Sequence, residues 1–136
     1  MTINVEQLLA KVPTGLLING QWRDAASGET FDVENPATGE VLATLASGNS
    51  EDAVAALDAA CAVQDEWART TPRERSNILR RAFELVTERK DEFAALMTLE
   101  MGKPLAEAYG EVTYGAEHLR WFSEEAVRDY GRSLPA

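Results

Sequence analysis

Cysteine and histidine are almost absent from this sequence of 136 residues, which holds one of each, Cys61 and His118. One cysteine excludes a disulfide within the chain, and one of each excludes the cysteine and histidine clusters that hold structural zinc. Cys61 stands in an alanine-rich helical segment without a basic residue at helical spacing. We therefore expect a small buried core cysteine rather than a nucleophile, and a structural or surface role for His118.

Basic residues are also scarce, because 13 Lys and Arg face 23 Asp and Glu, which gives a formal net charge of -10. Such a surface repels nucleic acids and anionic membranes. The chain does not open on a basic segment followed by an apolar stretch, and no apolar run approaches the roughly 20 residues of a membrane span. We expect a soluble, cytoplasmic protein with no nucleic-acid or membrane partner.

What the sequence does contain is the composition of one ordinary globular domain, with 45% hydrophobic and 26% charged residues. Residues 5–11 can form a short helical turn that Pro13 and Gly15 close, so we expect a flexible leader over residues 1–15. Asn19-Gly20 and, further on, residues 35–39 are turn signals between apolar runs. Each predicts two short strands, and strand content should end near residue 46.

From residue 49 onward the apolar period becomes helical. Asn49 or Ser50 can cap a helix that runs to about residue 67, and Thr71-Pro72-Arg73-Glu74 is a capping box that opens a second helix. Two more helices are expected over 91–101 and from about 104 to 128, separated by Gly102-Lys103-Pro104. The predicted fold class is α+β, with short N-terminal strands and then three to four helices. The core face of the second helix should comprise Ile78, Leu79, Ala82, Phe83 and Val86.

Six motifs follow one another in a characteristic order: residues 19–22, residues 35–40, Trp67, Arg73-x-Arg75, residues 98–104 with Glu107 and Glu111, and Trp121-Phe122 with Tyr130-Gly131. In this order and spacing they resemble the N-terminal region of the aldehyde dehydrogenase superfamily, over nearly all of residues 16–136. Within the superfamily, residues 97–108 and 121–126 most resemble the bacterial succinate-semialdehyde dehydrogenases.

The resemblance implies a long enzyme with a Rossmann-like α/β cofactor domain, a catalytic domain and an oligomerisation arm. Residues 16–136 would be the N-terminal part of the cofactor-binding domain. Family members oxidise aldehydes through a cysteine thioester and transfer a hydride to NAD or NADP. Their nucleophile, general base and cofactor contacts lie further along the chain, so no catalytic or cofactor-binding residue is assigned here. The 136-residue chain alone is expected to be inactive and to hold no cofactor, whereas the full-length enzyme would be a homo-dimer or homo-tetramer.

The resemblance also suggests a role for the last helix, which in family members passes near the mouth of the substrate channel. Glu111, Gly115 and His118 are therefore candidate channel residues, with plain packing or solvent exposure as the alternative. Gly110 and Gly115 each cost a helix interior about 1 kcal/mol relative to Ala, so close packing or space for a ligand is expected there. Lys103 follows a helix end, and we expect it to bind the terminal carbonyls rather than a substrate carboxylate.

Some family members hold a monovalent cation through main-chain carbonyls, at positions that match Val33, Glu34 and Glu100. Oxygen ligands suit a hard ion, so these residues are the candidate metal site.

The predicted function of the full-length protein is NAD(P)-dependent oxidation of succinate semialdehyde to succinate. Two alternatives remain open at this point. One is another semialdehyde dehydrogenase, such as one for glutarate semialdehyde, and the other is a truncated helical interaction module without catalysis.

Overall fold

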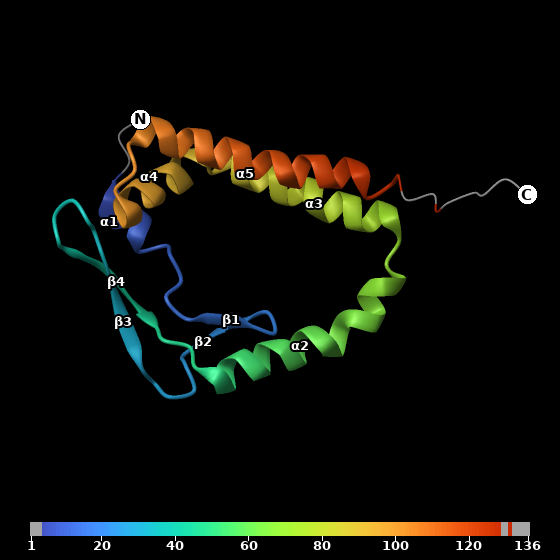
Figure 1. Ribbon diagram of the computed structural model, residues 1–136, viewed down its shortest axis with the longest axis horizontal. Coiled ribbons are helices and arrows are strands. Elements are labelled where there is room, and N and C mark those ends of the chain that lie inside the picture. The colour runs from blue at the N-terminus through green and yellow to red at the C-terminus, as the bar shows by residue number, and fades with distance from the viewer. Residues whose placement is uncertain (1–3, 129–130, 132–136) are drawn as a thin grey trace, which may run out of the picture.

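A computed structural model describes residues 4–128 and residue 131. The element order is α1 (Val5–Leu9), β1 (Leu16–Ile18), β2 (Gln21–Arg23), β3 (Thr30–Glu34), β4 (Val41–Ala46), α2 (Ser50–Arg69), α3 (Pro72–Glu88), α4 (Lys90–Met101) and α5 (Leu105–Glu125). Short strands precede four long helices (Figure 1), so the predicted α+β class is confirmed. Within the described ranges, no helix is long and apolar enough to cross a bilayer.

The first hairpin forms where the Asn-Gly signal predicts it. β1 and β2 pair antiparallel, and the loop between them is Asn19-Gly20. Asn19 has a φ of 52° and Gly20 a φ of 73°. Two positive φ values are the requirement of a type I′ turn, whose twist matches that of the flanking strands. The local sequence therefore specifies this turn.

The second hairpin joins β3 to β4 and is the other predicted strand pair. The Asn35 carbonyl accepts a hydrogen bond from the Gly39 amide at 2.7 Å, and the Asn35 side chain accepts one from the Ala37 amide at 3.0 Å. Gly39 adopts a φ of 74°, a backbone conformation that residues other than glycine rarely adopt. The pairing shifts by one residue between Val33 and Glu34, as in a β-bulge.

Capping boxes start both α2 and α3. The Glu74 amide donates to the Thr71 hydroxyl at 3.3 Å, and the Glu74 carboxylate accepts from the Thr71 amide at 3.0 Å. Asn49 caps α2 in the same reciprocal way with Asp52, at 3.2 Å in both directions. These bonds satisfy amides that the first helical turn leaves without partners. The helix starts predicted from sequence are confirmed.

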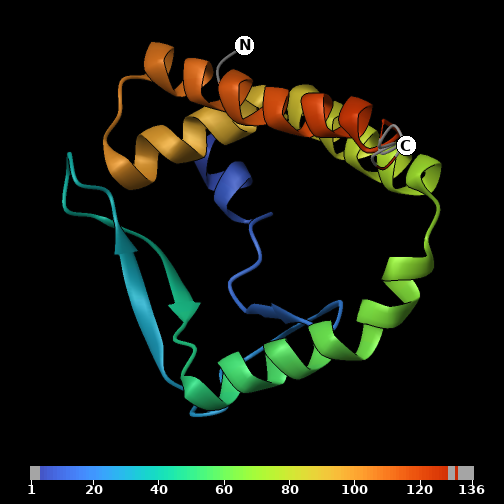
Figure 2. The same ribbon diagram turned by 45° about the vertical axis from the view of Figure 1, so that its right-hand side comes forward.

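Helices α3, α4 and α5 form the packed part of the molecule, and α2 lies apart from them in both views (Figures 1 and 2). Ala94 of α4 and Ala108 of α5 are 0% exposed, which lets the two helices approach closely. The α4–α5 corner turns at Gly102, which has a φ of 72°. A Cβ at Gly102 would lie 3.1 Å from Cγ of Pro36, so this corner also abuts the second hairpin.

Two burial predictions are wrong. Ile78 was expected in the core face of α3, yet its side chain is 53% exposed. The contact stripe of α3 includes the buried Ser76, and a residue two positions further points to a different side of a helix. Cys61 was expected to be buried, but it is exposed. The reason is that α2 touches β1, and nothing in the described part of the chain covers the middle of this helix.

The first 15 residues contact the rest of the molecule at several points, and the Thr14 carbonyl accepts a hydrogen bond from the Ala46 amide of β4 at 2.9 Å. Leu8 of α1 is 3% exposed, and Lys11 pairs with Glu92 of α4 at 3.2 Å. The flexible leader over residues 1–15 stays a prediction, as does the division of the chain at residue 16. The last helix ends at Glu125, a few residues before the predicted Arg128, and Tyr130 lies outside the described residues.

A buried carboxylate joins the first hairpin to α2. Asp52 is 3% exposed, and its Oδ1 accepts hydrogen bonds from the Arg23 guanidinium at 2.9 Å and from the Ala26 amide at 3.1 Å. The pKa of Asp52 lies below its ordinary value, chiefly because the Asn49 amide donates to it, with Ala26 and Arg23 adding to the effect against the cost of burial. Ionised Asp52 therefore holds a strand, a loop and a helix N-terminus together.

We predict that Asp52→Asn loosens this junction. A neutral amide cannot accept from the guanidinium and two amides as a carboxylate does, so hydrogen exchange of the Ala26 amide should accelerate by roughly tenfold or more. Because the folded-state pKa is lowered, the stabilisation is present above about pH 4 and is lost as pH falls through the folded pKa. NMR-detected exchange measures both effects. Asp58→Asn, an exposed change on the same helix, is the control, and equal exchange in both variants would contradict the prediction.

Candidate functional site

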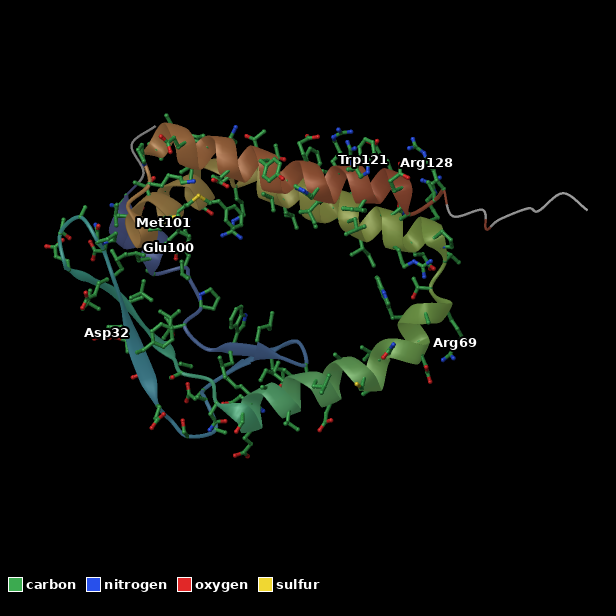
Figure 3. The ribbon with its side chains drawn as sticks, in the orientation of Figure 1. Asp32, Arg69, Glu100, Met101, Trp121 and Arg128 are labelled. Carbon is green, nitrogen blue, oxygen red and sulfur yellow. The ribbon has the colours of Figure 1, made fainter. Side chains whose placement is uncertain are left out.

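The last long helix, α5, has two contrasting faces. One face packs on α3 and α4 through four buried residues, Ala108, Val112, Ala116 and Ser123. Away from that face lie Tyr114, Trp121 and Phe122, whose side chains are 67%, 55% and 55% exposed. Trp121 is labelled on this helix in Figure 3. Large aromatic side chains left in water on one helix mark a surface that binds something.

Two open hollows lie along this exposed side of α5. One, of about 290 Å³, is lined by Tyr114, Glu117, His118, Trp121 and Phe122. The other, of about 400 Å³, is lined by Lys103, Glu107, Gly110, Glu111 and Tyr114. Tyr114 belongs to both, so the hollows are neighbours. We call these residues together the outer face of α5.

The three predicted channel residues lie on or beside this face. Glu111 lines one hollow and His118 the other. Gly115 is exposed next to Tyr114 but is not among the residues that line either hollow. The structure thus places the three predicted residues on one side of one helix. Their contact with a substrate stays a prediction.

Local contacts orient the His118 side chain. Its Nδ1 lies 3.0 Å from the carbonyl oxygen of Tyr114, one helical turn earlier. A carbonyl can only accept, so Nδ1 carries the proton in this contact, and in a neutral ring Nε2 is left as an acceptor. The Tyr114 and His118 rings meet edge to face at a centroid separation of 4.7 Å. The two rings therefore form one ordered wall at the centre of the outer face.

Lys103 has a different partner from the one expected. Its ammonium donates directly to the Glu111 carboxylate, two turns along α5. The expectation that it binds the terminal carbonyls of the preceding helix is wrong, because the chain reverses at residues 102–104 and α5 then brings the Glu111 carboxylate within reach. The Lys103 side chain is 20% exposed. Its charge is therefore fixed in place beside the larger of the two hollows.

Sequence reasoning missed Tyr114. The residue is the most exposed aromatic side chain of α5 and the shared wall of both hollows. A signal was available, because Tyr114 stands three residues after Glu111 and four before His118, which is the spacing of one helix face.

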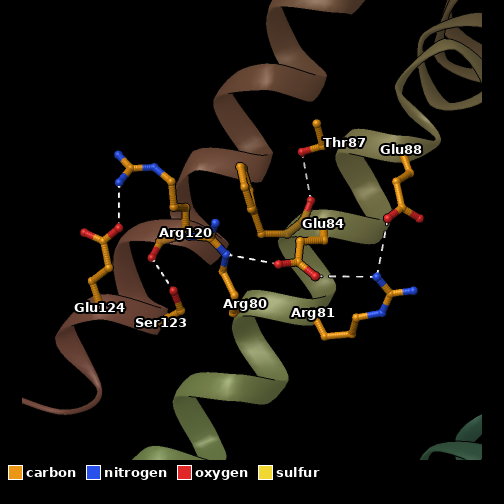
Figure 4. A network of polar contacts seen from close by, with 9 residues as sticks. Arg80, Arg81, Glu84, Thr87, Glu88, Arg120, Ser123 and Glu124 are labelled. Atoms are coloured by element: carbon orange, nitrogen blue, oxygen red, sulfur yellow. Dashed lines mark hydrogen bonds and ion pairs between the residues drawn. The ribbon is translucent and has the colours of Figure 1, made fainter.

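Arginine and glutamate side chains form a separate network around α3 and α5 (Figure 4). Arg80 pairs with Glu84 at 3.2 Å, and Arg120 pairs with Glu124 at 2.8 Å. The network borders a hollow of about 420 Å³ between the two helices. Each of these cations has an acidic partner and is partly exposed, so the network is a solvated surface with little preference for a charged ligand.

The candidate cation residues lie on two segments whose neighbouring residues come close, the end of β3 and the end of α4. Val33 and Glu34 flank the register shift at the end of β3. Glu100, labelled in Figure 3, lies in the last turn of α4, and Gly102 just after that helix abuts Pro36 of the second hairpin. The Thr98 hydroxyl of the same turn is buried without a hydrogen-bond partner in the described part of the chain. Oxygen atoms of this kind fit a hard monovalent ion. No group of three or more His, Cys, Asp or Glu that could hold a metal occurs among residues 4–128.

Known proteins resemble the chain in sequence and in structure. The chain is 77% identical over 94 residues to a succinate-semialdehyde dehydrogenase of Paenarthrobacter nicotinovorans, a match that covers 69% of this chain and 21% of that protein. It is 49% identical over 118 residues to a glutarate-semialdehyde dehydrogenase of Pseudomonas putida, covering 87% of this chain and 25% of that protein. A crystal structure of an E. coli NADP-dependent enzyme superposes with a TM-score of 0.90 at 44% identity, covering 99% of this chain and 27% of the other.

The chain thus spans about a quarter of the length of the proteins that it matches. The aldehyde dehydrogenase family matches residues 22–136, a range that begins within β2 and includes every later element of the fold. With structural agreement over nearly the whole chain as well, this chain belongs to the aldehyde dehydrogenase family.

Proposed function

We propose that this chain is the N-terminal part of an NAD(P)-dependent dehydrogenase that oxidises succinate semialdehyde to succinate. The observation that supports this substrate is the 77% identity to a succinate-semialdehyde dehydrogenase. In the proposed chemistry a cysteine thiolate adds to the aldehyde carbon, a hydride leaves to the cofactor, and water hydrolyses the resulting thioester. The complete enzyme is proposed to be a homo-dimer or homo-tetramer.

In this proposal the reacting groups come from other parts of the protein. Cys61 lies on α2, and it is not among the residues of the outer face of α5. In the described part of the chain Cys61 is a free, exposed thiol, and no hydrogen bond or ion pair there activates it. The segment of 136 residues is therefore proposed to be inactive when isolated and to bind neither NAD nor NADP by itself.

The contribution that we propose for this segment is a wall of the substrate channel, built from Glu111, Tyr114, Gly115 and His118. Gly110 and Gly115 support it. A Cβ at either position would meet nothing within 4 Å, and neither residue has a positive φ that would require glycine. Packing within the described structure therefore does not account for two glycines in a helix interior. The role that we propose for the two glycines is to leave space for a substrate that passes along α5.

A second semialdehyde dehydrogenase function is favoured by one observation. The glutarate-semialdehyde enzyme of Pseudomonas putida matches 118 residues of this chain. Its substrate differs from succinate semialdehyde by one methylene, a difference that a pocket distinguishes by about 1–3 kcal/mol. The two substrates are therefore tested side by side below.

We also propose that the main-chain carbonyls of Val33, Glu34 and Glu100 hold a monovalent cation. We predict that crystals grown with thallium(I) show an anomalous peak beside the main-chain carbonyls of Val33, Glu34 and Glu100. Gly102→Val should abolish the peak, because a side chain there would press on Pro36 and move the end of α4 from the second hairpin. Crystals of the unmodified protein without a peak would contradict the proposal.

Alanine replacements test whether Gly110 and Gly115 are needed for close packing or leave space for a substrate. We predict that Gly110→Ala and Gly115→Ala each stabilise the 136-residue chain by up to about 1 kcal/mol, since the new methyl group meets no atom and alanine favours helix. Urea unfolding measures the change. Gly102→Ala is the control and should destabilise, because a φ of 72° strains alanine. Destabilisation by Gly110→Ala would show a packing role and contradict the channel assignment.

Activity is tested with the complete gene product. We predict that it forms NADH or NADPH with succinate semialdehyde, and that kcat/KM is about 10- to 200-fold lower with glutarate semialdehyde. Absorbance at 340 nm follows the reaction with each cofactor. The 136-residue segment expressed alone is the matched control and should show no turnover. A higher kcat/KM with glutarate semialdehyde would replace the proposed substrate, and no oxidation of either would overturn the proposed function.

A further inference from the structure

The outer face of α5 is acidic. Glu107, Glu111 and Glu117 all line its hollows, and the lysine among the lining residues is Lys103. Glu117 has its own cation, because the Arg120 guanidinium pairs with it at 2.7 Å and lowers the pKa of its carboxyl. Glu111 is paired with Lys103. The hollow beside Lys103 therefore carries two carboxylates, one of them neutralised.

An acidic face opposes the proposed substrate, since succinate semialdehyde carries a carboxylate at neutral pH. Like charges a few ångströms apart repel, and the repulsion is stronger beside a protein surface than in bulk water. A neutral aldehyde of the same length feels no such repulsion. The net charge of this hollow therefore affects how readily an anionic aldehyde enters the channel compared with a neutral one.

Resting on the proposed function, we propose that Lys103 is a specificity-determining residue that admits carboxylate-bearing aldehydes by neutralising Glu111. Without its ammonium, Glu107 and Glu111 would face the substrate as two adjacent negative charges. With it, the hollow carries one net negative charge, and the ammonium has hydrogen atoms left to attract an anion. Lys103 acts through this field and takes no part in the reaction itself.

The position of the Lys103 ammonium is restricted by its surroundings. Its side chain is 20% exposed, whereas that of Lys11, which also pairs with a glutamate, is 63% exposed. Gly102, with a φ of 72°, and the φ-restricted Pro104 fix the backbone on both sides. A charge held in one position by a stiff corner acts on a passing anion more consistently than a mobile one.

A double-mutant cycle of Lys103 and Glu111 in the complete enzyme, measured with a charged and an uncharged aldehyde, tests the role of Lys103. The two substrates are succinate semialdehyde and its methyl ester, which has the same carbon skeleton without the negative charge. Lys103→Met should lower kcat/KM for the anion by about threefold to tenfold and change that for the ester by less than about twofold. Glu111→Gln should raise kcat/KM for the anion. The double variant removes one charge of each sign and should restore the unmodified ratio of anion to ester.

A purely structural ion pair predicts something else. Both single variants and the double variant would then lower kcat/KM for the two aldehydes alike, and that result would overturn the proposal. Lys11→Met, which breaks the pair with Glu92 away from the outer face, should leave the ratio unchanged. The effect of Lys103→Met should also shrink in high salt. If the unmodified enzyme oxidises neither aldehyde, the proposed function itself has failed and this inference falls with it.

Discussion

Helix α5 packs closely against α3 and α4, and this contact determines which of its side chains are buried and which are exposed. Ala94 and Ala108 are fully buried at the contact between α4 and α5, and a larger side chain at either position would force the helices apart. The packing buries one face of α5, and the opposite face carries Tyr114 and the two hollows that it lines. Small buried residues let one face of α5 pack against α3 and α4. The opposite face therefore stays exposed and can contact a ligand.

A second constraint is the Asp52 carboxylate, which ties the first hairpin to α2 through Arg23 and Ala26. Beyond that junction α2 presents large apolar side chains to solvent, among them Leu57 and Trp67. An independent domain would bury such residues against a core of its own. In a chain that spans about a quarter of its relatives' length, uncovered apolar faces support the proposal that further parts of the same protein pack on them.

Prediction from sequence succeeded where the deciding contacts are local. The Asn19-Gly20 turn and the Thr71 capping box depend on atoms within four residues, so their residue types suffice. It failed where the deciding partner is distant in sequence. Ile78 and Cys61 have apolar neighbours at helical spacing, but their exposure depends on what covers each helix. The hydrogen bond that the Ala26 amide donates to Asp52 spans 26 residues, and Lys103 meets Glu111 only because of the chain reversal at Gly102.

The intact mass of the gene product, purified from its source and detected with an antibody against residues 4–128, decides whether this chain is part of a longer dehydrogenase. We expect a mass between three and four times 14.9 kDa, because the matching proteins are between three and four times as long as this chain. A product of 14.9 kDa would contradict that expectation. The channel wall on α5 would then have no catalytic residues opposite it, and the chain would be better explained as a helical interaction module.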